Sequence, residues 1–199
     1  MARSIIQFVC FKTSYNEQRF LPAWEPFASA FLARGLERIV LSRSLQPEGE
    51  YGFISRNLWD DQSFAATFPN GLPGDAGGFG IIAVQAGGFR MVAGPRAQLH
   101  EARRGLVKAI GLVEFKPDVS TATAGLQSVL AALSWEEADW ALFESALPRW
   151  NGRYGAVIEA FALPADAKSM LTDLKQAALE VQSIRNVDLA LYNEFSVLP

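Results

Sequence analysis

Two copies of a G-x-Y-G pattern stand 103 residues apart in this chain, at residues 49–52 and 152–155. Two further pairs of segments align at nearly the same spacing: residues 11–12 with 115–116, and residues 39–41 with 141–143. An internal repeat constrains the fold strongly, because each copy must form a similar structural unit. The sequence therefore predicts two modules, residues 1–94 and 106–199, joined by a linker over residues 95–105.

The composition narrows the expected partners and location. The formal net charge is −3, whereas a nucleic-acid surface needs clustered Lys and Arg, so we expect no nucleic-acid partner. No apolar run approaches the roughly 18 residues that indicate a membrane helix, so we expect no membrane partner. Cys10 is the only cysteine, which excludes an intrachain disulfide and favours a reducing, cytoplasmic location. Its place in an apolar strand pattern favours a buried, inert thiol over a nucleophile.

Each module is expected to contain a strand, a helix, two strands, a helix and a strand, which is the ferredoxin-like order. In the first module, aromatic residues at helical spacing predict a helix over residues 18–34, and Gly35 is suited to end it. The remaining elements follow from alternation, turn residues and apolar stripes: strands 4–12, 37–45, 51–59, 80–92, 106–116, 139–147, 154–163 and 186–198, and helices 61–68, 120–135 and 165–182. Apolar residues from Leu99 to Val113 also have helical spacing, so one long helix there is an alternative.

Several expected strands are apolar on both faces, which is typical of strands that are buried on both sides. A ferredoxin-like sheet covers only one face with its own helices. The open face of one module therefore needs a partner, and the second module of the same chain supplies one. Two such sheets packed face to face form a closed or nearly closed barrel with the helices outside.

In element order and repeat spacing, the chain resembles the dimeric α+β barrel superfamily over essentially its whole length. The resemblance implies an α+β fold in which two fused ferredoxin-like βαββαβ modules form an intramolecular pseudo-twofold barrel. That superfamily includes cofactor-independent monooxygenases and haem-binding chlorite dismutases. The resemblance rests on no diagnostic motif, and no specific family within the group is matched.

The residues argue against a bound cofactor or metal. Haem members of the superfamily use an axial ligand, usually a histidine, in the C-terminal module, whereas the single histidine here, His100, lies in the expected linker. One histidine also leaves no metal-ligand spacing. The glycine-rich segment 74–80 precedes a strand and lacks the Lys-Ser/Thr of a phosphate-binding loop. We therefore expect no cofactor and no metal.

The candidate site residues are polar or aromatic side chains within expected strands: Arg43, Arg56, Asn57, Trp59, Glu144, Glu159 and Tyr192. Arg56 and Glu159 are equivalent under the 103-residue spacing, so the repeat reverses the charge at that position. Two interpretations remain open. Either the charges face solvent at strand ends and edges, or some face the barrel interior, where a buried charge must be paired and could orient a ligand.

Two functional hypotheses follow. The first is a protein that binds a small organic molecule, with a cofactor-independent monooxygenase-like activity as its enzymatic form. The second is a structural or interaction protein with a filled core and no site. Either form is expected to be a monomer or a homodimer. The G-x-Y-G segments are interpreted as strand-connecting turns and not as a site.

Overall fold

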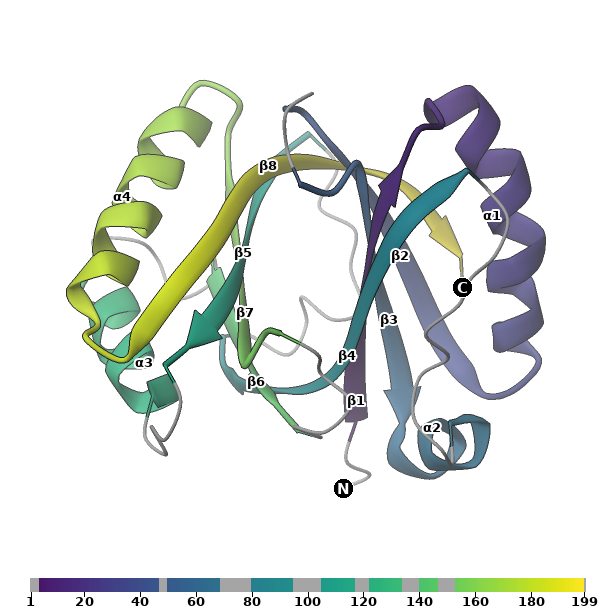
Figure 1. The fold of residues 1–199 in the computed structure, drawn as a ribbon, viewed down its shortest axis with the longest axis horizontal. Coiled ribbons are helices and arrows are strands. Elements are labelled where there is room, and N and C mark those ends of the chain that lie inside the picture. The colour runs from purple at the N-terminus through teal and green to yellow at the C-terminus, as the bar shows by residue number, and fades with distance from the viewer. Residues whose placement is uncertain are drawn as a thin grey trace.

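A computed structural model describes residues 4–46, 50–68, 80–94, 105–116, 122–133, 140–146 and 153–198. In this part of the chain, eight antiparallel strands close into a barrel and four helices pack outside it (Figure 1). The sequence-based interpretations of His100, of most of the glycine-rich segment and of the first glycine in each G-x-Y-G copy lie outside the described residues.

The strands are β1 Ser4–Thr13, β2 Leu36–Ser44, β3 Phe53–Asp60, β4 Ile81–Ala93, β5 Val107–Phe115, β6 Trp140–Ser145, β7 Ala156–Ala162 and β8 Ile184–Leu198. The helices are α1 Glu17–Leu32, α2 Asp61–Thr67, α3 Ala122–Ala132 and α4 Ala167–Glu180. The predicted order of elements is confirmed. The alternative of one helix up to Val113 is wrong, because β5 is a strand that pairs with both β7 and β8.

The strand order around the barrel is β1-β3-β2-β8-β5-β7-β6-β4, with β4 returning to β1. Residues 4–93 contribute the run β4-β1-β3-β2, and residues 107–198 contribute β8-β5-β7-β6. The two runs have the same order and meet at two seams, where β2 pairs with β8 and β4 pairs with β6.

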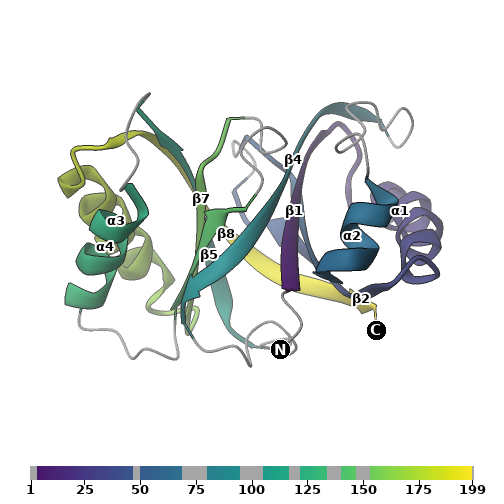
Figure 2. The same cartoon turned by 90° about the horizontal axis from the view of Figure 1, so that it is seen from below.

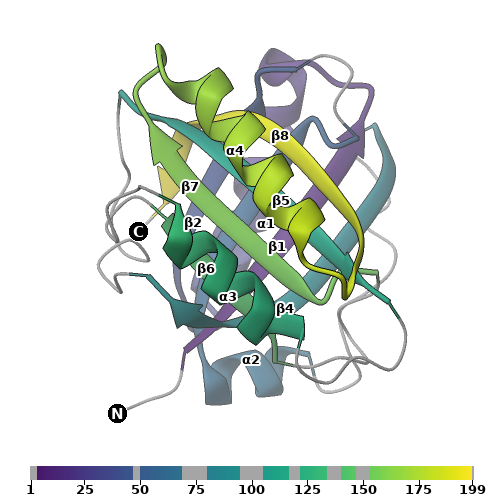
Figure 3. The same cartoon turned by 90° about the vertical axis from the view of Figure 1, so that its left-hand side faces the viewer.

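Alternating side chains of each strand divide the core into three layers. On β1, Ile6, Phe8 and Cys10 belong to the cluster that fills the barrel, whereas Ile5 and Phe11 belong to the cluster beneath α1 and α2. A third cluster lies beneath α3 and α4 on the opposite side. Figures 2 and 3 show these helix pairs on opposite flanks of the barrel. Both faces of the sheet are therefore buried, as the two-sided apolar strands predicted.

Helix α1 has clear local reasons to begin and end where it does. The side chain of Asn16 accepts a hydrogen bond from the backbone N–H of Arg19, which caps the first turn. Gly35 follows the helix with φ of 90°, a conformation that favours glycine. A Cβ at Gly35 would lie 2.4 Å from Oγ of Ser63, so glycine also permits close contact with α2.

Candidate functional site

The barrel interior contains a buried cluster of four charged residues, which we call the ion cluster: Arg56 on β3, Lys108 on β5, Glu159 on β7 and Glu194 on β8. Their side chains are at most 5% exposed. Arg56 contacts Glu159 directly, and Nζ of Lys108 lies 3.1 Å from Glu159 and 2.6 Å from Glu194. Each charge thus has an opposite charge close by, and the cluster is neutral overall.

The two cations determine the protonation state of Glu159. Burial would raise the pKa of this carboxyl group, but Arg56 and Lys108 outweigh burial and hold the pKa below its ordinary value. Glu159 is therefore an ionised, fully paired carboxylate. The four interior charges are therefore paired with one another.

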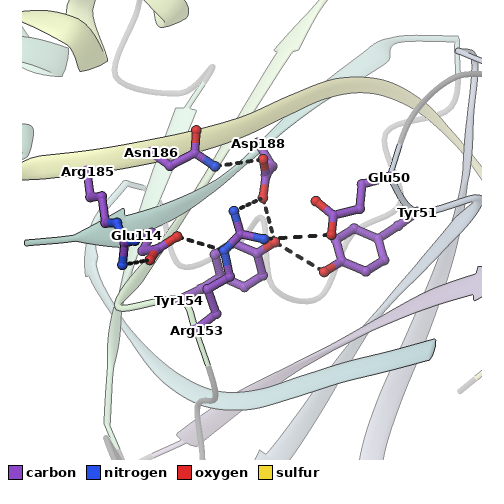
Figure 4. Close-up of polar contacts among 8 residues, drawn as sticks. All are labelled: Glu50, Tyr51, Glu114, Arg153, Tyr154, Arg185, Asn186 and Asp188. Atoms are coloured by element: carbon purple, nitrogen blue, oxygen red, sulfur yellow. Dashed lines mark hydrogen bonds and ion pairs between the residues drawn. The ribbon is translucent and has the colours of Figure 1, made fainter.

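The tyrosines of the two G-x-Y-G copies point toward each other within the barrel (Figure 4). The hydroxyl groups of Tyr51 and Tyr154 are 3.1 Å apart, and Tyr154 donates a hydrogen bond of 2.5 Å to Asp188. Nε of Arg153 lies 2.7 Å from Glu114, and its guanidinium also approaches Glu50 and Asp188. The repeated segments therefore join the two halves of the barrel, a contact that their interpretation as simple turns did not anticipate.

This tyrosine pair predicts alkaline destabilisation. Burial raises the pKa of Tyr51 to about 12, and burial with the bond to Asp188 raises the pKa of Tyr154 further. A phenol whose pKa is higher in the folded state stabilises the fold below its unfolded pKa of 10.0, and that contribution is lost as the pH rises through the folded value. We expect the free energy of unfolding, measured by urea titration, to fall between pH 10 and 12.

Tyr154→Phe should make this fall shallower, because one of the two phenols with a raised pKa is then absent. Equal pH slopes for the wild type and Tyr154→Phe would contradict the assignment.

A pocket lies between α1 and the outer face of the first-half sheet, and we call it the α1 pocket. It has a volume of about 60 Å³. Most of its walls are apolar and aromatic, with contributions from α1, the sheet and the residue after α2: Trp24, Phe27, Ala28, Phe31, Leu36, Ile39, Val9, Phe11, Val84, Ala86 and Phe68. Such walls with a few convergent polar groups are typical of small-molecule sites.

The sheet side of the α1 pocket carries a connected polar network. Oε1 of Gln7 accepts hydrogen bonds of 3.0 Å from both the Trp59 indole and the Asn57 amide, and Ser55 donates to Oδ1 of Asn57. An indole N–H can only donate, so the atom of Gln7 that faces it must be the oxygen. The amide nitrogen of Gln7 is thereby directed elsewhere, as a donor.

The described residues of the other half of the barrel lack this network. In the first half, the cross-strand pair of Asn57 and Gln7 stands next to the pair of Arg56 and Phe8. In the second half, the corresponding pair of Glu159 and Ile110 stands next to the pair of Ala160 and Ala109. These two alanines belong to the apolar cluster beneath α3 and α4. Polar groups are thus present at these positions in only one half of the barrel.

The structure separates the sequence-derived candidates into several places. Asn57 borders the α1 pocket, and Trp59 is bonded to its floor; Arg56 and Glu159 are in the ion cluster. Tyr192 is buried in the barrel and donates towards the backbone carbonyl of Tyr51.

The two remaining candidates lie away from both groups. Arg43 pairs at the surface with Glu17, and Glu144 is exposed and accepts a hydrogen bond from Thr123. Sequence reasoning missed Gln7 and Lys108. The only available signal was a polar side chain within an apolar strand.

No known protein family matches the sequence, and no curated protein matches it at a significant level. Solved structures do match the fold. An anthrone oxidase-like protein aligns over 100% of this chain and 93% of its own, with 9% identity and a TM-score of 0.64. A "putative monooxygenase" from Lactobacillus acidophilus NCFM aligns over 98% and 95%, with 10% identity and a TM-score of 0.56.

A mutant chlorite dismutase from Candidatus Nitrospira defluvii aligns over 98% of this chain and 92% of its own, with 13% identity and a TM-score of 0.56. At these identities the likeness establishes the fold alone, and the neighbours are dimeric α+β barrel proteins. Among the described residues, no helix has the length and hydropathy needed to cross a membrane.

Proposed function

We propose that the α1 pocket binds an uncharged, ring-containing small molecule that carries an acceptor oxygen such as a carbonyl. The observation that carries this proposal is the polar network of Gln7, Asn57 and Trp59 beneath aromatic walls. The described lining includes no Asp, Glu, Lys or Arg, which favours a neutral ligand, because a charged group without a partner is costly to bury. Gln7 lines the pocket and its oxygen is already engaged, so its amide nitrogen, a donor, favours a ligand with an acceptor.

Oxygenation by molecular oxygen, without a bound cofactor, is the reaction class that we propose for such a ligand: a CH2 group becomes C=O, and the second oxygen atom leaves with the two hydrogens as water. Its support is the fold shared with an anthrone oxidase-like protein and a "putative monooxygenase", together with a site of amide and aromatic groups. The ion cluster and the tyrosine pair fill the barrel interior with mutually satisfied groups, which favours the outer pocket as the site. The alternative, a structural protein without a site, makes the opposite prediction for ligand binding.

We further infer that the chain consists of two modules, residues 1–94 and 106–199, with a linker over residues 95–105 and a pseudo-twofold axis between them. Two corresponding backbone bonds support this inference, and they align Phe11 with Val113, whereas the sequence spacing aligned it with Phe115. The N–H of Gly52 donates to Phe11 at 3.0 Å, and that of Gly155 to Val113 at 2.9 Å. A cytoplasmic monomer or homodimer is the form that we propose for the protein.

Binding can be tested with two probes that differ only in the acceptor, acetophenone and ethylbenzene. We expect both to shift NMR signals of the α1 pocket, with acetophenone bound about 3- to 10-fold more tightly, since a net hydrogen bond contributes about 0.5–1.5 kcal/mol. The side-chain amide signals of Gln7 should shift with acetophenone and stay in place with ethylbenzene.

Ala86→Leu supplies the matched test of location, because Ala86 is only partly buried and lines the α1 pocket. The larger side chain should weaken acetophenone binding at least about tenfold by occupying the space. Ala83→Leu, an exposed position on the same strand, should bind like the wild type. The proposal fails if acetophenone shifts no pocket signals, or if both variants bind it equally.

A further inference from the structure

The α1 pocket is too small in its closed form for a complete ligand. Its volume of about 60 Å³ is well below the roughly 300–1,000 Å³ of typical small-molecule sites. Four of its lining residues, Trp24, Phe27, Ala28 and Phe31, come from α1, and most others come from the sheet. Because the sheet is part of a closed barrel, α1 is the wall that can move with the least disruption (Figure 2).

The backbone of α1 is weakened in the stretch that covers the α1 pocket. Pro22 and Pro26 both lie inside the helix. A proline has no N–H, so the carbonyl groups of Gln18 and Pro22 lose their ordinary helical donors, and each interior proline disfavours the helix strongly. Oγ of Ser29 also bonds to the carbonyl of Glu25 at 2.8 Å, a local contact that often accompanies helix bending.

Each end of α1 has a local contact that fixes its position. Asn16 caps the start of the helix, and Gly35 approaches Ser63 of α2 closely after its end. In the middle, Trp24 and Ala28 are each 3% exposed, but Phe27 is 39% exposed and rests edge-to-face on Phe31. Phe27 is thus the least buried of these three side chains, and its outward movement would enlarge the α1 pocket.

We infer that the middle of α1, residues 22–28, is a lid that opens about its two prolines and admits ligand to the α1 pocket. This inference rests on the proposed function for the identity of the site. Opening is a local event that costs less free energy than global unfolding, because the proline-interrupted turn has fewer backbone bonds to break. When the lid returns over a bound ring, Phe27 and Trp24 cover it from a position farther from the sheet than in the empty pocket, and this covered state retains the ligand.

Amide hydrogen exchange of the full-length protein tests the motion without a ligand. Amides of residues 23–29 should exchange at least about tenfold faster than those in the middle of α4, a helix with no proline within it. Pro26→Ala restores a backbone donor and should slow exchange in α1 about tenfold. Pro164→Ala, an exposed position before α4, is the matched control and should leave exchange in α1 unchanged.

Stopped-flow binding of acetophenone then connects the motion to the site. In Pro26→Ala, the association and dissociation rate constants should fall together by about threefold or more, with little change in Kd, because a lid alters access without altering the closed complex. Equal α1 exchange in the wild type and Pro26→Ala overturns the lid, even if acetophenone binds. If exchange responds as expected but acetophenone leaves the α1 pocket signals unchanged, the proposed function fails and the gating role fails with it.

Discussion

Arg56→Met is expected to lower the free energy of unfolding by about 3–5 kcal/mol, because it leaves a buried carboxylate without its principal partner. Glu159 is completely buried and contacts Arg56 and Lys108. With Arg56 removed, one lysine remains to balance two carboxylates in the barrel interior. Urea denaturation monitored by circular dichroism measures the loss, and the slope of the free energy against urea concentration should stay constant.

Arg43→Met is the matched control for this prediction. Arg43 and Glu17 also form an ion pair, but their side chains are 44% and 40% exposed, so the loss should stay within about 1 kcal/mol. The double variant Arg56→Met/Glu159→Gln should recover much of the stability lost in Arg56→Met. It removes one charge of each sign and leaves the pair of Lys108 and Glu194 intact.

A loss below about 1 kcal/mol for Arg56→Met would mean that the ion cluster is not energetically coupled. A double variant that is less stable than Arg56→Met would mean that Glu159 stabilises the barrel without Arg56. Either result would contradict the assignment of mutual charge neutralisation.

The element order was predictable because its signals are local. Aromatic spacing predicted α1, and turn residues separated the strands; the closed barrel followed from strands that are apolar on both faces. Whether each charged side chain faces the barrel interior or the helices was not predictable, because the strands are apolar on both faces. On β3, Ile54 and Leu58 face the barrel interior, whereas Phe53 and Trp59 face the helices. When both faces are apolar, alternation cannot distinguish inside from outside.

The 103-residue spacing marks the repeat and also identifies pairs of residues that touch. It pairs Arg56 with Glu159 and Tyr51 with Tyr154, and both pairs are in direct contact in the structure. Residues related by a twofold axis can touch only near that axis, so these contacts are the expected result if two modules face each other. The reversed charge at the first pair converts a repulsive contact into an attractive one.

The α1 pocket was harder to predict from the sequence. Asn57 and Trp59 were selected, but their common acceptor, Gln7, lies on a strand that is 50 residues away from Asn57 in sequence. The register of β1 with β3 brings these groups together, and register is a tertiary property that depends on which face of each strand is covered. The asymmetry with Ala109 and Ala160 becomes visible only when the paired strands are compared.

Trp59→Ala is expected to lower the free energy of unfolding by about 3–5 kcal/mol and to weaken acetophenone binding in the α1 pocket about 3- to 10-fold, the effect of one net hydrogen bond. The ring is completely buried and packs against Phe31, Phe64 and Phe68. Its removal leaves a cavity under α1 and also frees Gln7 to rotate, because the donor that fixes the orientation of the amide is lost.

Trp140→Ala separates the two effects. Trp140 is 5% exposed and lies in the apolar cluster beneath α3 and α4, so its loss should destabilise the protein by a similar amount without weakening acetophenone binding. Binding is measured by NMR titration at low temperature, where both variants are checked for folding by circular dichroism. Trp59→Phe refines the result, since it keeps a six-membered aromatic ring and removes the indole donor. If Trp59→Phe still binds acetophenone 3- to 10-fold more tightly than ethylbenzene, as one net hydrogen bond predicts for the wild type, the indole does not orient Gln7 for ligand recognition.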